Sequence, residues 1–95
     1  MRLSDGTLFL TWSPYPVDHY IVACAISDNG SIKGKWQHFD TPLFDKNGGH
    51  AMFFDDFEGN RKMCIHCPEQ PPLERALIMN VKEENGTIKI IGNVI

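Results

Sequence analysis

The stretch Asn47-Gly48-Gly49-His50-Ala51-Met52-Phe53-Phe54 decides the fold class of this sequence. A glycine pair, which permits a tight turn, leads directly into a run of alternating side chains. Because successive side chains of a strand point to opposite faces, His50 and Met52 share one face and Ala51 and Phe53 share the other. This pattern predicts a β-strand that begins at a turn.

Similar runs recur along the chain between Gly, Asn, Asp and Pro residues, as in strands joined by tight turns. Turn sequences such as Asn29-Gly30 and Asn85-Gly86 accept a positive φ easily. No stretch predicts a helix, so we expect an all-β antiparallel meander; periodicity alone does not choose among propeller blades, half a sandwich and a small barrel. The predicted strands are Thr7–Trp12, His19–Ile26, Lys35–Phe39, His50–Phe54, Arg61–His66, Leu73–Val81 and Thr87–Val94.

Composition limits the size of the core and the classes of partner. With 95 residues, 42% of them hydrophobic, the chain can hold one modest core. Its net charge of −3 provides no basic field, which argues against nucleic acid and membrane surfaces as partners. The polar start at residues 1–5 and the absence of a long apolar run predict a soluble chain without a targeting segment, and leave the compartment of a longer parent protein open.

About seven strands in one or two small sheets would leave unpaired edges and half-covered apolar faces. Something must cover them. We therefore expect that the chain is part of a larger protein, or that it forms a homo-oligomer when it is stable alone.

The stretch Cys64-Ile65-His66-Cys67 raises the question of a metal or redox site. In a strand, Cys64 and Cys67 would lie on opposite faces, and no second cysteine pair follows. Three cysteines do not make a disulfide framework either, so reduced, buried thiols are the better interpretation. Four aromatic side chains are capable of stacking on sugars but are expected in the core, namely Trp12, Tyr15, Tyr20 and Trp36.

His50 is the main candidate for a functional side chain. It follows Gly49 at a strand start, where backbone can approach a ligand closely and the imidazole can point along the strand end. By itself, a histidine in such a place is more often structural.

Several ordered motifs over residues 3–80 resemble family-43 glycoside hydrolases. Residues 5–36 resemble the fourth-blade region of that family, and residues 42–75 resemble its fifth blade. The motifs of the second region are Pro42-Leu43-Phe44, Gly48-Gly49-His50-Ala51-Met52-Phe53-Phe54, Phe57-Glu58-Gly59, His66-Cys67-Pro68-Glu69 and Pro72-Leu73-Glu74-Arg75.

The resemblance implies a five-bladed β-propeller, of which residues 1–95 form a single partial domain of one and a half to two blades. Residues 1–40 would be the end of blade four and residues 41–95 blade five. The resemblance also implies that the parent protein is an inverting glycosidase of the endo-1,4-β-xylanase, β-xylosidase or arabinanase type. Such an enzyme would act on xylose- or arabinose-containing plant polysaccharides. The alternative is a standalone, non-catalytic β-sheet module that binds carbohydrate or another partner and self-associates.

The resemblance also implies which site residues to expect. The family's catalytic glutamate lies in a Glu-Gly-Pro motif just before the strand that matches Thr7–Trp12, and its two aspartates lie further upstream. We therefore expect no catalytic residue in this chain, and no activity of the chain alone. Gly49 and His50 are the expected substrate-channel residues, and His50 the residue that would hold calcium through water in a complete propeller; the 95 residues alone require no cofactor. The chain departs from the family pattern at Ala51, Cys67 and Glu69.

Overall fold

Seven antiparallel strands make up the computed structural model, which describes residues 1–93. Residues 1–93 include no helix of the length and apolar character needed to cross a membrane. The all-β prediction is confirmed. The strands are β1 (Phe9–Trp12), β2 (Ala23–Ser27), β3 (Trp36–His38), β4 (Gly49–Asp55), β5 (Arg61–His66), β6 (Ala76–Glu84) and β7 (Thr87–Asn93).

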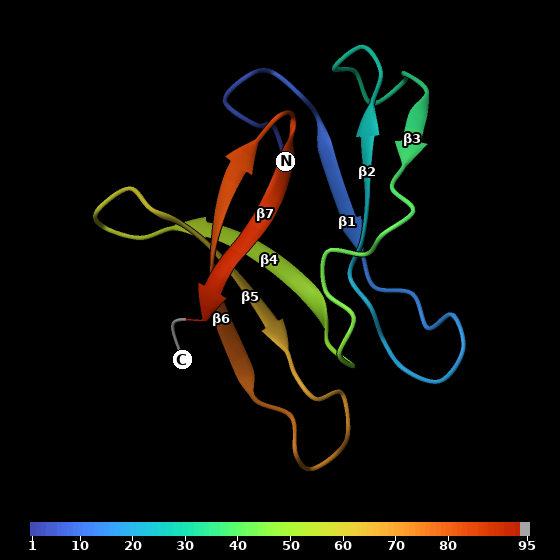
Figure 1. Ribbon diagram of the computed structural model, residues 1–95, viewed down its shortest axis with the longest axis vertical. Helices are drawn as coiled ribbons and strands as arrows, with labels where there is room; N and C mark the ends of the chain where they lie inside the picture. Colours follow the sequence, from blue (N-terminus) through green and yellow to red (C-terminus); the bar gives the residue numbers. More distant parts are fainter. Residues whose placement is uncertain (94–95) are drawn as a thin grey trace.

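The strands form two meander sheets, in which every strand pairs with its neighbour in the chain. One sheet has the order β1-β2-β3 and the other β4-β5-β6-β7. Figure 1 shows the three-stranded sheet at the upper right and the four-stranded sheet beside it, with β1 and β4 facing each other across the gap. The molecule is flat, 18 Å along its shortest axis.

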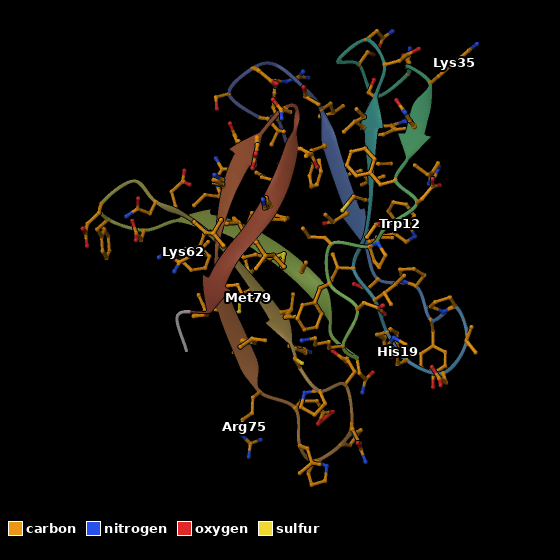
Figure 2. The ribbon with its side chains drawn as sticks, viewed as in Figure 1. Trp12, His19, Lys35, Lys62, Arg75 and Met79 are labelled. Carbon is orange, nitrogen blue, oxygen red and sulfur yellow. The ribbon has the colours of Figure 1, made fainter. Side chains whose placement is uncertain are left out.

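One apolar core lies between the two sheets. Phe9 of β1 is fully buried, and its ring lies 6.4 Å from the Phe53 ring of β4 in an edge-to-face arrangement. Met79, labelled in Figure 2, lies on the inner face of the four-stranded sheet. The buried members of the core are Leu3, Phe9, Val22, Cys24, Met63, Ile65, Met79, Val81 and Ile88.

The alternation predicted for β4 is present. Met52 is 60% exposed, while Phe53 packs against the core. The outer face of this sheet, to which Met52 belongs, therefore carries apolar side chains that nothing within residues 1–93 covers.

Turns fix the register of two hairpins in the four-stranded sheet. Asn85 and Gly86 both have positive φ, 52° and 76°, as a type I′ hairpin requires, and Glu84 pairs with Thr87 directly beside them. The hairpin before β5 is held by Asp56, whose carboxylate accepts the N–H groups of Glu58 and Asn60 at 2.9 and 2.8 Å.

Two strands differ from their predicted bounds by three residues or more, and the smaller differences include β1, which begins at Phe9 instead of Thr7. The predicted strand His19–Ile26 begins only at Ala23, because His19 and Tyr20 bond to the loop before β4 instead of to a strand. The predicted strand Leu73–Val81 runs from Ala76 to Glu84, since pairing with β7 continues past the last apolar residue. Val94, at the end of the last predicted strand, lies outside the described residues.

Candidate functional site

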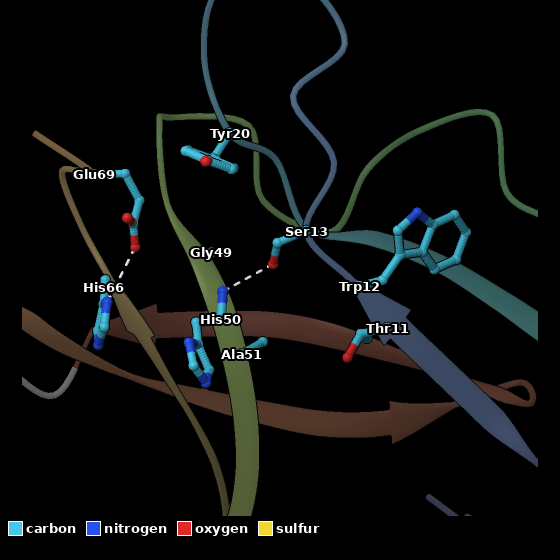
Figure 3. A pocket seen from close by; sticks show the side chains of 9 residues that line it. All are labelled: Thr11, Trp12, Ser13, Tyr20, Gly49, His50, Ala51, His66 and Glu69. Carbon is cyan, nitrogen blue, oxygen red and sulfur yellow. Dashed lines mark hydrogen bonds and ion pairs between the residues drawn. The ribbon is translucent and has the colours of Figure 1, made fainter.

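A cavity of about 600 Å³ opens where the end of β1 meets the start of β4. Figure 3 shows its walls, with His66 and Glu69 on one side and Trp12 on the other. The residues that line it are Thr11, Trp12, Ser13, Tyr20, Gly49, His50, Ala51, His66 and Glu69.

The two glycines before His50 are needed for packing. A Cβ on Gly49 would lie 2.9 Å from Cβ and Oγ of Ser13, and a Cβ on Gly48 would lie 2.7 Å from Cδ1 of Ile65 and 2.8 Å from Cε1 of Phe44. Gly49 therefore lets the start of β4 approach the end of β1. Gly48 lets the turn before β4 pack closely against Ile65 and Phe44. Gly48 does not line the cavity.

His50 has an unusual backbone conformation, with φ +57° in a residue other than glycine. The register between β4 and β5 shifts between Gly49 and Met52, so one extra residue is accommodated here as a β-bulge. The His50 N–H donates a hydrogen bond to Ser13 Oγ at 2.8 Å. Bulges of this kind re-aim side chains, and here the imidazole projects into the cavity.

A second imidazole lies beside that of His50. The ring centroids of His50 and His66 are 5.4 Å apart, and Nδ1 of His66 lies 3.1 Å from Oε1 of Glu69. The backbone N–H of Glu69 donates to the carbonyl of Asn47 at 2.9 Å, which ties the loop after β5 to the turn before β4. The Glu69 side chain is only 22% exposed.

Three aromatic side chains in or near the cavity face solvent. Trp12 and Tyr20 are each 36% exposed, and Tyr15, whose ring packs edge-on against Tyr20, is 55% exposed. The prediction that these three residues lie in the core is wrong. Tyr15 and Tyr20 lie in the loop after β1, which runs over the surface, and Trp12, the last residue of β1, lines the open cavity.

His19 joins the loop after β1 to the loop before β4. Its Nδ1 lies 2.6 Å from Asp18 Oδ1, and its Nε2 lies 2.7 Å from Asp45 Oδ1. Hydrogen bonds to Asp45 and then Asp18 raise the pKa of His19. The Tyr20 N–H also donates to the side chain of Asn47, at 3.2 Å. These contacts hold Tyr20 at the rim of the cavity.

The cysteines form no disulfide and no metal site within residues 1–93. Cys24 is buried, and burial raises the pKa of its thiol to about 11. Cys64 and Cys67 are only partly buried. The described part of the chain contains no cluster of three or more His, Cys, Asp or Glu side chains that converge on a metal position.

The calcium expected at His50 stays a prediction. Calcium takes six to eight oxygen ligands, and among residues 1–93 the one carboxylate that lines the cavity, Glu69, is paired with His66. The expected contact runs from His50 through water, so it does not depend on a carboxylate in this cavity.

The structure brings both predicted channel residues, Gly49 and His50, to the same cavity. Their role stays a prediction. Sequence reasoning missed Ser13, His66 and Glu69 as partners of His50. The signal for the last two was a His and a Glu three residues apart, in a stretch that was considered for its thiols and for its resemblance to the family pattern.

Comparison with solved structures gives a match to an endo-arabinase from Bacteroides thetaiotaomicron VPI-5482. The TM-score is 0.83 and the sequence identity 30%, over 92% of this chain and 31% of the other. The predicted resemblance is confirmed. The chain spans about a third of the length of that endo-arabinase, since it covers 31% of it. No protein-family model and no curated protein matches the sequence.

The two sheets therefore have the architecture of propeller blades, one with three strands and one with four. Which blades of the propeller they represent stays a prediction.

Proposed function

We propose that this chain is part of an inverting glycoside hydrolase that degrades arabinose- or xylose-containing plant polysaccharides. The observation that carries the proposal is the match to an endo-arabinase over 92% of the chain at 30% identity. That relative favours arabinan over xylan as the substrate class. The cavity at Gly49 and His50 would form one wall of the sugar channel, with Trp12 and Tyr20 offering ring faces for stacking.

The number of carboxylates in the cavity supports the proposal that the chain alone is inactive. Inversion requires two carboxyl groups about 6.5–9.5 Å apart, one to protonate the leaving group and one to activate a water on the opposite face of the sugar. Among residues 1–93, Glu69 is the one acidic residue that lines the cavity, and it is paired with His66. The catalytic acid and base would come from other blades of a longer parent protein, as would any calcium near His50.

The outer edge of β1 is only partly paired within residues 1–93. Residues 1–3 pair with the strand start: Leu3 N–H donates to the Thr7 carbonyl at 2.8 Å, and Phe9 N–H to the Met1 carbonyl at 2.7 Å. In a longer chain, this antiparallel pairing would extend along Leu10–Trp12 and give the three-stranded sheet a fourth strand.

A chimeric enzyme tests the proposal. The matching third of the Bacteroides endo-arabinase is replaced by residues 1–95, and release of reducing sugar is measured on arabinan and on xylan. We expect the chimera to hydrolyse arabinan, and the 95-residue chain to hydrolyse neither polymer. A folded but inactive chimera, or turnover by the isolated chain, would contradict the proposal.

The second candidate is the standalone, self-associating binding module. The exposed apolar side chains of the outer face of β4–β7 favour it, because a partner must cover them; Met52 is 60% exposed and Phe54 39%. Sedimentation of the isolated chain together with titration by arabino- and xylo-oligosaccharides tests this. A discrete oligomer with saturable sugar binding supports the module, and a monomer without binding contradicts it.

A further inference from the structure

Within residues 1–93, one ion pair joins the loop after β1 (residues 13–22) to the loop before β4 (residues 39–48), that of His19 with Asp45. We propose that Asp18, His19 and Asp45, here called the His19 bridge, form a pH-sensitive switch that positions Tyr20 at the mouth of the cavity. The bridge is closed while the His19 ring carries two protons, and it opens when the ring loses one of them. This inference does not depend on the proposed hydrolase function.

The contacts of the His19 ring are those of a doubly protonated imidazole. Nδ1 lies 2.6 Å from Asp18 Oδ1, and Nε2 lies 2.7 Å from Asp45 Oδ1. An ionised carboxylate only accepts hydrogen bonds, and a neutral imidazole has one N–H to donate, whereas an imidazolium has two. A neutral ring would therefore turn a lone pair toward one of the two carboxylates. Since both compete for its single proton, the bond to Asp45 would be formed about half of the time.

The charges around His19 set the pH at which the bridge opens. Within residues 1–93, no lysine or arginine pairs with either carboxylate of the bridge. Hydrogen bonds to Asp45 and then Asp18 raise the pKa of His19, so the bridge opens as pH rises through a value above the ordinary one of about 6.5. The other titratable side chains of the two loops make no hydrogen bond or ion pair with the ring; they are Tyr15, Tyr20, Asp40 and Lys46.

Tyr20 connects the bridge to the cavity. It follows His19 in the chain, lines the cavity, and has its Cβ 3.8 Å from the position that a Cβ on Gly49 would occupy. In the described structure, two side-chain contacts hold residues 14–20 to the loop before β4. One is the contact of His19 with Asp45, and the other is the 3.2 Å bond from the Tyr20 N–H to Asn47 Oδ1. When the bridge opens, only the longer bond remains, and Tyr20 moves away from the start of β4.

The tip of the loop after β1 moves as a unit with the bridge. The Tyr15 hydroxyl donates to the Asp18 carbonyl at 2.8 Å, and the Tyr15 ring packs edge-on against that of Tyr20, with the centroids 5.0 Å apart. Figure 2 shows His19 on this loop, at the edge of the molecule. The three side chains of the bridge all reach solvent. Because exposed ion pairs stabilise weakly, the loss of one proton is enough to shift the loop between two populations.

NMR of the 95-residue chain between about pH 5.5 and 9 tests the proposal. The ring shifts of His19 give its titration midpoint, and the nuclear Overhauser effect between Tyr20 Hβ and Gly49 Hα reports the contact at the mouth of the cavity. We expect this effect to be strong at the acidic end and to fall about two-fold or more above the His19 midpoint, as a single shared proton requires. The two transitions should have the same midpoint.

Two variants assign the transition to the bridge and not to another histidine. His19→Gln should show the weak Tyr20 contact at every pH, although the histidines of the cavity remain. Asp45→Asn offers a donor and an acceptor, so it can bond to either form of the ring. It should lower the His19 midpoint and make the Tyr20 contact independent of pH.

The matched control is His38→Gln, which removes an exposed imidazole that belongs to neither loop and should leave the transition unchanged. A Tyr20 contact that does not change with pH, or a midpoint that differs from that of the His19 ring, would overturn the proposal. So would a pH dependence that persists in His19→Gln.

Discussion

The backbone N–H of His50 donates to Ser13 Oγ across 2.8 Å, which makes the end of β1 a support for the bulge in β4. Replacing Ser13 by Ala removes the acceptor without adding bulk. We expect the free energy of unfolding to fall by about 0.5–1.5 kcal/mol in urea denaturation, the net value of one hydrogen bond. Thr41→Ala, at an exposed position, should change it by less than about 0.5 kcal/mol. Equal effects of the two substitutions would speak against this role of Ser13.

Gly49→Ala tests the close approach of the same two strands. The new Cβ would lie 2.9 Å from Cβ and Oγ of Ser13, so the strands must separate. We expect a loss of about 1–3 kcal/mol, as for other overpacked sites. Adding Ser13→Gly should recover part of this loss, and the coupling is measurable in a double-mutant cycle. Additive effects would mean that the two residues do not press on each other.

Met63 and Met52 allow the stability effect of truncating a buried side chain to be compared with that of truncating an exposed one. Met63 is fully buried between the sheets, whereas Met52 is 60% exposed on the outer face. Met63→Ala should cost about 2–5 kcal/mol in chemical denaturation because it leaves a cavity. Met52→Ala should cost less than about 0.5 kcal/mol. A larger loss at Met52 in dilute solution would show that a partner copy covers the outer face.

The two carboxylates around His19 make stability depend on pH. Because Asp45 and Asp18 raise the pKa of His19 in the folded chain, its contribution is fully present below the ordinary pKa of about 6.5 and is lost as pH rises through the raised value. Denaturation of the native chain and of His19→Gln between about pH 5 and 9 should therefore give curves that converge on the alkaline side. His38→Gln, which breaks no ion pair, should not show this convergence. A constant difference across the range would contradict the linkage.

The three thiols should react in an order set by burial. The pKa of Cys24, about 11, leaves almost no thiolate at pH 8, and the side chain is buried in the core. With iodoacetamide, mass spectrometry should find Cys64 and Cys67 modified before Cys24. In urea all three should react at similar rates. Early labelling of Cys24 in the folded chain would mean that the core opens readily.

The strands were predictable because their periodicity and turn residues are local properties. Asn85-Gly86 alone fixes a hairpin, and its type I′ geometry is observed. The start of β2, after His19, was not predictable, because it depends on the contact between His19 and Asp45. The end of β6, at Glu84, was not predictable either, because it depends on pairing with β7. Of the candidate site, Gly49 and His50 were found from sequence; their partners were not. Ser13 and Glu69 are far from His50 in the chain, and only the packing of β1 beside β4 and the return of the loop after β5 bring them together.

The meander order has a consequence for how quickly this chain folds. Since all pairing within each sheet is between strands that follow each other in the chain, the longest loop that must close within a sheet is residues 13–22. Hairpins of this kind form in about 1–10 μs, and topologies rich in local pairings fold faster than sandwiches with long-range ones. We therefore expect the four-stranded sheet to assemble progressively outward from its tightest turn, with docking of β1 against β4 as the late step that creates the cavity.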